Sequence, residues 1–558
     1  MNEIEINEIN KNDIFEMPYE NNEYTKYNPL HNELGIKMNK NIEYIKKITY
    51  NKYEIIDNGI KKECFKKFIT LVDYVKFLIG KYKNDKIETL PGDSISPTTL
   101  LTTPSTPSLS LFQEYINSYH NYAYVDGFFY YLTSTLLEKG FVHGLDFYDS
   151  YICISKECEI DIVDDFEYLC DSNYFSENLN KQFYFKDENL GDFFNKKSPI
   201  VISETNETIH VEFEEFEDLD KVEEDCDINY EKVNCEINCE NDIVELDNEK
   251  NDNESDNDSD DSDIVLDDSD DSDDSDDSDD SDSDDSDDSD GFETDSNDTD
   301  SNEVEKLILV IKKIPTQVIA IEKCEGTFDY LLENNLLTIE ELESAIFQII
   351  AMLYVYQHIF DFTHNDLHTN NVMFIHTEEP FLYYKIKETH YKIPTFGKIY
   401  KIIDFGRSIY KVNNKVVCSD SFSENGTAHT QYNFEPFYNK NKKEVKPNKS
   451  FDLCRLSCSM IDFIIDDIKQ IQKFREVPIY DLIISWLYDD NGINVLYKNN
   501  GEERYPDFKL YKMIARIVHN HVPENQFNHV CFNKYKDIYT DKVKYMNIDE
   551  LIKTQDHL

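Results

Sequence analysis

The sequence lacks any run of about 18 apolar residues, so no segment is expected to cross a membrane as a helix. It also lacks an apolar core after Met1, where the residues are polar and acidic, and no secretory signal peptide is expected. Both absences predict an intracellular protein without a membrane partner.

Cysteine pairs at the spacing of a zinc site are missing as well. The twelve cysteines are scattered. Cys235/Cys239 and Cys454/Cys458 are each four residues apart, but neither pair has a second pair at zinc-site spacing. We therefore expect reduced thiols, mostly buried as small apolar side chains, and no cysteine metal site.

Basic residues are absent between Lys250 and Lys306. Residues 201–300 hold 46 Asp or Glu and three Lys, a net charge of −43, so −59 − (−43) leaves −16 for the rest of the chain. A Ser-Asp-Asp repeat runs from Ser269 to Asp290. Such a segment cannot bury enough apolar surface to offset chain entropy, which predicts a disordered acidic insertion over 201–303.

This charge disfavours direct nucleic-acid binding and favours basic protein partners. The insertion can be a solvated spacer, a landing site for basic proteins or, because its serines are flanked by carboxylates, an acceptor for acid-directed kinases.

Ordered elements are predicted on both sides of the insertion. Asn58-Gly59 predicts a tight turn between strands Tyr53–Ile56 and Ile60–Leu71. The Ser-, Thr- and Pro-rich stretch Leu90–Leu111 predicts a loop. A helix is expected over Phe112–Leu137, and strands over Leu145–Ser155 and Val318–Glu322.

After the insertion, Phe328–Leu332 is expected to be helical. Apolar residues then recur at helical spacing and predict one long helix to about Phe360; they are Leu342, Ile346, Ile349, Ile350 and Leu353.

The most informative stretch follows that helix and reads His364-Asn365-Asp366-Leu367-His368-Thr369-Asn370-Asn371. Asp404-Phe405-Gly406 comes 33 residues after Asn371, at the end of an expected strand Ile399–Ile403. Phosphoryl transfer needs a carboxylate to orient and deprotonate the attacking hydroxyl, and oxygen ligands to hold Mg²⁺ on the phosphates. Asp366 is the candidate catalytic base, and Asn371 and Asp404 are the candidate metal ligands.

In these motifs the chain resembles the protein kinase superfamily, whose catalytic loop reads H-x-D-L-x-x-x-N and whose metal motif reads D-F-G. From about Lys52 to His529, insertions excepted, it looks like the divergent Ser/Thr protein kinases of giant DNA viruses. His368 and the long Glu378–Lys398 excursion resemble haspin-like kinases.

The resemblance implies an α+β fold with two lobes, and ATP and Mg²⁺ between them. It implies a β-rich N-lobe over 41–324 with loop 88–111 and the insertion, a C-lobe over 325–558, and a flexible segment over 1–40. If the chain is viral, the expected location is the host cytoplasm or the virion. Lys67 and Asp126 are the expected phosphate-binding pair, and Glu322 and Cys324 lie at the expected hinge, Glu322–Gly326. Asp452 is expected to hold the backbone of the catalytic loop from the start of a central helix.

Several residues depart from the kinase pattern. No G-x-G-x-x-G precedes the first hairpin, Lys66 can replace Lys67, and Glu114 is an alternative to Asp126. Asn365 and His368 replace the usual Arg and Lys. Without that Arg, activation by a phosphate on the activation segment is not expected.

Three functions remain open: a Ser/Thr protein kinase acting on protein hydroxyls, a small-molecule kinase resembling aminoglycoside or choline phosphotransferases, and a pseudokinase scaffold that recruits basic partners. Intact Asp366 and Asp404 favour the first.

Overall fold

The computed structural model describes residues 24–36, 38, 42–92, 110–163, 165–187, 307–465 and 467–553. These residues belong to one compact unit, Met1–Phe194 with Asn297–Leu558. The predicted disordered insertion at 201–303 lies outside the described residues, as does most of the predicted loop, from 93 to 109. In the described part, no helix combines the length and apolarity needed to cross a bilayer.

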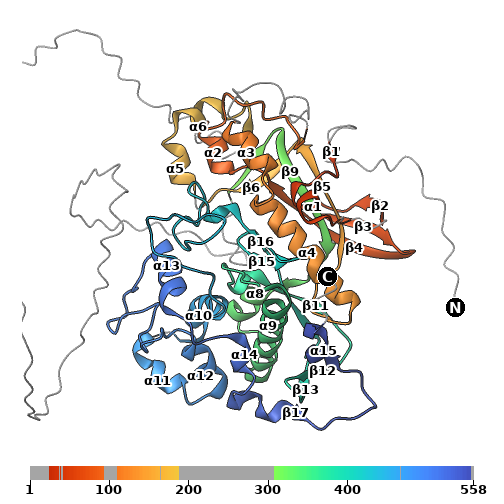
Figure 1. The fold of residues 1–558 in the computed structure, drawn as a ribbon, viewed down its shortest axis with the longest axis vertical. Coiled ribbons are helices and arrows are strands. Elements are labelled where there is room, and N and C mark those ends of the chain that lie inside the picture. The colour runs from red at the N-terminus through yellow and green to blue at the C-terminus, as the bar shows by residue number, and fades with distance from the viewer. Residues whose placement is uncertain are drawn as a thin grey trace, which may run out of the picture. The chain divides into compact units, whose positions relative to one another are not determined.

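The fold is mixed α and β, as the sequence predicts, and its largest sheet is a curled antiparallel one (Figure 1). Six strands run in the order β1-β5-β9-β4-β3-β2. Their bounds are β1 Tyr24–Thr25, β2 Ile42–Lys47, β3 Lys52–Asp57, β4 Ile60–Thr70, β5 Phe147–Ser155 and β9 Ile314–Glu322.

The β3–β4 hairpin is confirmed at its predicted turn. Asn58 and Gly59 have φ values of 50° and 79°, the left-handed conformation that a tight two-residue turn requires. In β4, alternate side chains face opposite sides of the sheet, so Lys66 and Lys67 diverge.

The predicted single helix Phe112–Leu137 is wrong in one respect, because the chain forms two helices. These are α3, Leu111–Asn117, and α4, Tyr122–Glu138. α3 ends at its C-cap Ser118, and Asn121 caps the start of α4, where its side chain accepts from the Ala123 N–H and also donates to the Leu71 carbonyl. α4 packs against β5 and β9 (Figure 1).

Gly127 makes this packing close. A Cβ at Gly127 would lie 2.1 Å from Gln317 Nε2, on β9. A larger residue at this position, next to Asp126, would require the Gln317 side chain or the helix to shift.

A second small sheet has the order β6-β8-β7, with strands Cys158–Asp161, Ile308–Ile311 and Phe183–Phe185. Nearby short helices are α2 Tyr74–Leu78, α5 Phe166–Cys170 and α6 Asn173–Asn178. The undescribed stretch 188–306 is thus bounded by residues just beyond two paired strands, β7 and β8.

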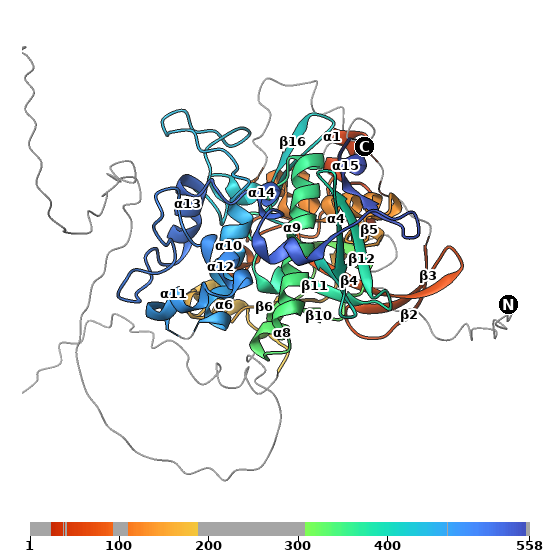
Figure 2. The same ribbon diagram turned by 90° about the horizontal axis from the view of Figure 1, so that it is seen from below.

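The predicted long helix is α9, Ile339–Phe360, preceded by α8, Phe328–Glu333. Thr338 and Glu341 form a capping box at its start, which satisfies two of the first free backbone N–H groups. Figure 2 shows α9 near the centre, with α10 and α12 to its left and α8 below it. The remaining helices are α10 Phe451–Ile464, α11 Ile471–Phe474, α12 Pro478–Ser485, α13 Phe508–Ile517, α14 Pro523–Gln526 and α15 Ile548–Leu551.

Short sheets surround α9. One has the order β10-β11-β14, with strands Gly326–Thr327, Val372–His376 and Lys398–Ile402. The excursion 378–398 forms a hairpin, β12 Phe381–Ile386 and β13 Thr389–Pro394, flanked by β17 Lys536–Asp537 and β18 Met546–Asn547. The two-stranded sheet after Asp404 has β15 Ile409–Val412 and β16 Lys415–Cys418.

The expected flexible segment 1–40 needs a correction within its described part. Tyr24–Thr25 pairs with β5, and Pro29–Leu34 forms helix α1, capped by the Asn28 side chain. Leu30 is fully buried. These few apolar residues are ordered by tertiary packing, which their local sequence does not reveal.

Candidate active site

Lys67 lies between two carboxylates that come from distant parts of the chain. Its Nζ is 2.9 Å from Asp126 Oδ2 on α4 and 2.8 Å from Asp404 Oδ1, just after β14. The Asp126 side chain is fully buried, whereas that of Asp404 is 51% exposed. The predicted pairing of Lys67 with Asp126 rather than Glu114 is therefore present in the structure.

Asp126 also holds the chain beyond β14. Its Oδ1 accepts from the Phe405 N–H at 2.6 Å, while Oδ2 accepts from Lys67. Asp is one methylene shorter than the Glu usual in kinases.

Phe405 anchors the neighbouring Asp404. The Phe405 ring is fully buried, with its centroid 4.7 Å from that of Phe129 and 4.9 Å from that of Tyr130. The Asp404 N–H donates to the Tyr130 hydroxyl at 2.9 Å, and Asp404 adopts a left-handed φ of 63°. These contacts direct the Asp404 carboxylate towards Lys67.

Burial and charge oppose each other in this cluster. Burial raises the pKa of Asp126 to about 6, although Lys67 acts to lower it. Burial also acts to raise the pKa of Asp404, but Lys67 outweighs it and lowers that pKa to about 2. Burial acts to lower the pKa of Lys67, and the two carboxylates raise it well above its usual value. Lys67 is a permanent cation at neutral pH.

Lys66 occupies the opposite face of β4. Its Nζ lies 3.3 Å from the Tyr151 hydroxyl and 4.1 Å from the centroid of the Tyr53 ring. Burial lowers the pKa of Lys66 to about 8. Lys66 therefore contacts a different set of groups from the cluster at Asp404.

Asp452 fixes the backbone of the loop around Asp366 by hydrogen bonds, as expected from the place of Asp452 at the start of α10. The fully buried Asp452 carboxylate accepts from the His364 N–H at 3.0 Å and the Asn365 N–H at 2.9 Å. Burial raises the pKa of Asp452 to about 7, although these bonds act to lower it.

Asn365 is a structural residue here. Its φ is 64°, its Nδ2 donates to the Arg407 carbonyl at 2.9 Å, and its Oδ1 accepts from the Tyr432 hydroxyl at 2.8 Å. It joins the loop to the segment that follows Asp404.

Asn371 lies close to both Asp366 and Asp404. Its Nδ2 donates to the Asp366 carbonyl at 2.9 Å and lies 3.1 Å from His368 Nε2. Its carbonyl accepts from the Ile403 N–H at 3.0 Å, since β11 pairs with β14 beside it. Asn371 and Asp404 therefore lie at the same end of this strand pair.

The Asp366 carboxylate has two partners that the sequence did not predict. Oδ1 accepts from the Tyr511 hydroxyl of α13 at 2.8 Å, and Oδ2 lies 3.4 Å from Arg407 Nη1. Arg455 Nε donates to the same Tyr511 oxygen at 2.9 Å. Arg407 directly follows Asp404-Phe405-Gly406, and this position could have indicated that its guanidinium lies near Asp366. Tyr511, 145 residues from Asp366, left no local signal.

Asp420 ties the segment after Asp404 to the start of α4. Its Oδ1 accepts from the Tyr122 N–H at 2.9 Å, and burial raises its pKa to about 7. This contact links the segment to the helix that carries Asp126.

The other two predicted residues lie in the segment that leaves β9. Glu322 Oε2 is 3.3 Å from Lys401 Nζ, and the Glu322 N–H donates to the Asp146 carbonyl at 2.8 Å. Burial raises the pKa of Cys324 to about 12, so its thiol is neutral. No contact in the structure joins either residue directly to the Lys67 cluster, and a role in binding ATP stays a prediction for both.

The donor chemistry at Asn371 and Asp404 fits Mg²⁺. Because the Asn371 amide nitrogen faces the Asp366 carbonyl, the amide can meet a cation only through its oxygen. Asp404 supplies an exposed, ionised carboxylate. Among the described residues no three His, Cys, Asp or Glu side chains gather as a metal site. Two protein oxygens suit an ion that retains waters and also contacts phosphate.

No protein-family model matches the chain, and no curated protein is significantly similar to it in sequence. Function has to be inferred from the side chains that the fold brings together.

Proposed function

We propose that this chain is a Mg²⁺- and ATP-dependent phosphotransferase with a two-lobed fold of the protein-kinase type, acting on Ser or Thr hydroxyls of proteins. The observation that carries the proposal is the bridge from Lys67 to Asp126 and Asp404. It joins a strand, a helix and the Asp-Phe-Gly segment, the pairing that phosphate positioning requires in kinases.

In this proposal, Lys67 binds ATP phosphate oxygens as a point charge, and Asp126 holds the ammonium in place. Asn371 and Asp404 would hold Mg²⁺, which supplies charge neutralisation on the phosphates when bound. Asp366 orients the acceptor hydroxyl and accepts its proton, since its carboxylate is partly exposed and fixed by Tyr511 and Arg407.

The proposed reaction accounts for each bond formed and broken and for the proton. The acceptor oxygen forms a bond to the γ-phosphorus as the bond from that phosphorus to the β-phosphate bridging oxygen breaks. ADP leaves with the electron pair, and the hydroxyl proton passes to Asp366.

Transfer of radiolabelled γ-phosphate tests the function directly. The acceptors are a basic protein, an acidic protein, and a mixture of small amines and sugars. Wild type is expected to label protein Ser or Thr, and Asp366→Asn to lose about 10²–10⁴-fold in rate while keeping its fold. Labelling of only the small molecules would favour the small-molecule kinase, and no labelling of any acceptor would reject the proposal.

A further inference from the structure

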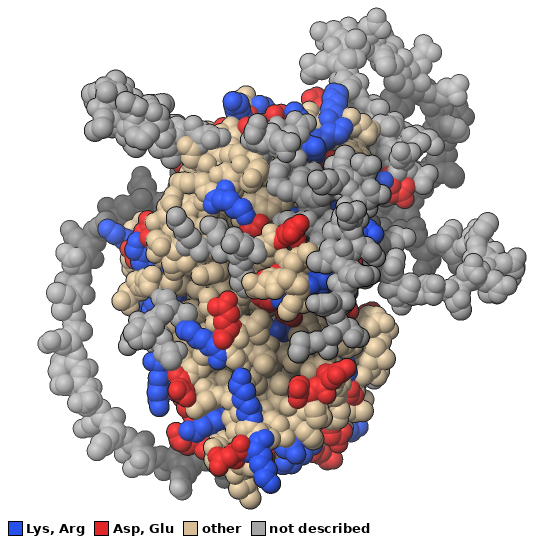
Figure 3. Space-filling view, turned by 90° about the vertical axis from the view of Figure 1, so that its right-hand side faces the viewer, with Lys and Arg blue, Asp and Glu red and all other residues tan. Residues whose placement is uncertain are grey.

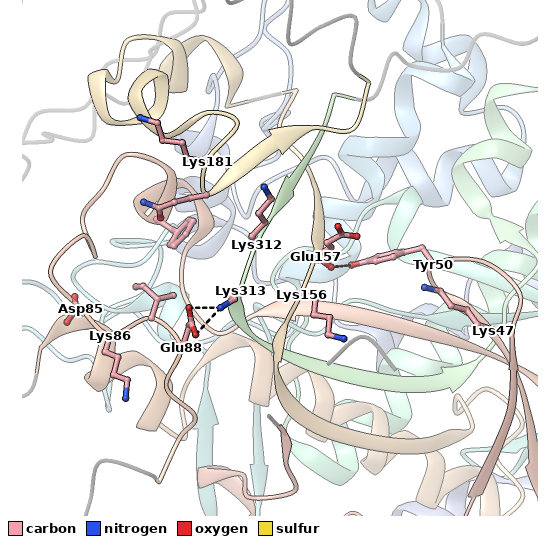
Figure 4. A pocket seen from close by; sticks show the side chains of 13 residues that line it. Lys47, Tyr50, Asp85, Lys86, Glu88, Lys156, Glu157, Lys181, Lys312 and Lys313 are labelled. Carbon is pink, nitrogen blue, oxygen red and sulfur yellow. Dashed lines mark hydrogen bonds and ion pairs between the residues drawn. The ribbon is translucent and has the colours of Figure 1, made fainter. Parts of the chain in front are cut away.

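A hollow of about 1040 Å³ lies in the part of the fold beside the β8–β9 turn. Five separate stretches of chain bring lysines to it (Figure 4). The six lysines are Lys47, Lys86, Lys156, Lys181, Lys312 and Lys313. We call it the lysine hollow.

The lysine hollow has an excess of positive charge in a chain whose net charge is −59. Three acidic residues also line it, so the six lysines leave the lining with a net charge of +3. Glu88 is paired with Lys313 at 3.2 Å, and Glu157 accepts from the Tyr184 hydroxyl. Of the six lysines, only Lys313 has a carboxylate within ion-pair distance among the described residues. The other five ammonium groups are not neutralised by that part of the chain.

This local excess differs from the surface in Figure 3, where acidic and basic side chains are interspersed over the described residues. Mixed charge is ordinary for a soluble surface. A concave site with an excess of one sign of charge instead focuses the electrostatic field and attracts counter-charged ligands.

Hydrogen bonds connect the turns that form the lysine hollow. The Lys312 N–H donates to the Gln182 carbonyl at 2.9 Å, and the Tyr50 hydroxyl donates to the Glu157 carbonyl at 3.3 Å. The lysines therefore project from a connected framework, with apolar contacts available from Tyr50, Phe77 and Ile87.

The site is separate from the candidate active site. Lys67 pairs with Ile319 on β9, and Lys313 is six residues earlier on that chain segment. At about 3.3 Å per strand residue, Lys313 lies about 20 Å along the strand from the position of Lys67.

We propose that the lysine hollow binds acidic peptide segments of partner proteins. Figure 4 shows its lysine side chains pointing in several directions around the hollow rather than converging on one point. Dispersed point charges match a chain that carries several carboxylates, whereas one phosphate is better matched by a rigid, planar guanidinium fork. The hollow contains lysines and no arginine.

A short fluorescein-labelled Glu-rich peptide tests the proposal by fluorescence anisotropy, with a Gln-rich peptide of the same length as the control. The full chain should bind only the Glu-rich peptide, and more weakly at about 200 mM than at about 50 mM salt. The charge reversal Lys156→Glu/Lys312→Glu should weaken binding by about tenfold or more. Lys469→Glu/Lys473→Glu, which changes charge equally on exposed residues elsewhere, should leave Kd unchanged.

A chain lacking residues 245–300 is measured in parallel, because those carboxylates can compete with the peptide. Peptide binding by either chain that is lost in Lys156→Glu/Lys312→Glu supports the site. Failure of both chains to bind, or equal loss in both charge reversals, overturns it. Binding of tripolyphosphate at these lysines without binding of the peptide also overturns it, since the ligand would then be a compact phosphate.

Discussion

Replacing Lys67 with Met tests the central cluster, because it shortens the side chain by only one atom and removes its charge. Through Asp126, wild type loses stability as the pH rises from about 4 to 6 and then levels off, because the Lys67 ammonium holds the Asp126 pKa at about 6 against burial. Without Lys67 this carboxyl stays protonated to higher pH. Each pH unit is worth about 1.4 kcal/mol, so at pH 7 the variant loses about 1.4 kcal/mol through Asp126.

The contribution of Asp404 is smaller. Lys67 lowers the pKa of Asp404, but its side chain is half exposed, so solvent screens the pair to about 1 kcal/mol or less. The total loss should be about 1–3 kcal/mol at pH 7, and it should grow as the pH rises above 6. At pH 5, where Asp126 is protonated in both proteins, only the small Asp404 contribution remains.

Denaturant unfolding at about pH 5, 7 and 8 measures this pH dependence. The double variant Lys67→Met/Asp126→Asn should recover stability, since removing both partners leaves no buried charge. Lys66→Met is the matched control and should neither produce this pH dependence nor abolish phosphoryl transfer, which Lys67→Met should reduce strongly. A stability loss equal at pH 5 and pH 8, or loss of transfer in Lys66→Met alone, would refute the assigned roles of the two lysines.

Further predictions concern the candidate base, the metal ligand and the buried acids. Tyr511→Phe removes the donor to Asp366, so transfer should fall about tenfold or more; an unchanged transfer rate would mean that Tyr511 only packs. Asp404→Ala should abolish stabilisation by Mg²⁺ and ATP in thermal-shift titrations, whereas a shift equal to that of wild type would place the metal elsewhere. Asp420 and Asp452 have folded-state pKa values of about 7, above the usual 3.8. The folded state therefore binds more protons between pH 4 and 7, and the free energy of unfolding should be higher at pH 6 than at pH 8; replacing both residues with Asn should flatten this difference.

Several elements could be read from local sequence because their determinants are local. Asn58-Gly59 specifies its turn through backbone conformation, and the apolar periodicity before Phe360 specifies α9. The break between α3 and α4 was not predicted, because helical spacing continues across Asn121 while its hydrogen bond to the Leu71 carbonyl is a tertiary contact.

The sequence by itself determined the order of the candidate base and the candidate metal ligands, Asp366, Asn371 and Asp404. It also determined that no glycine-rich loop precedes them. It left two lysines and two acids as alternatives for the phosphate-binding pair. Tertiary structure decided which of them meet, since strand alternation sends Lys66 and Lys67 to opposite faces and α4 brings Asp126 to Lys67. It also decided the contact of Tyr511 with Asp366 and the gathering of the lysine hollow. Residues so far apart in sequence meet only through the packing of strands and helices, and no periodicity records such a meeting.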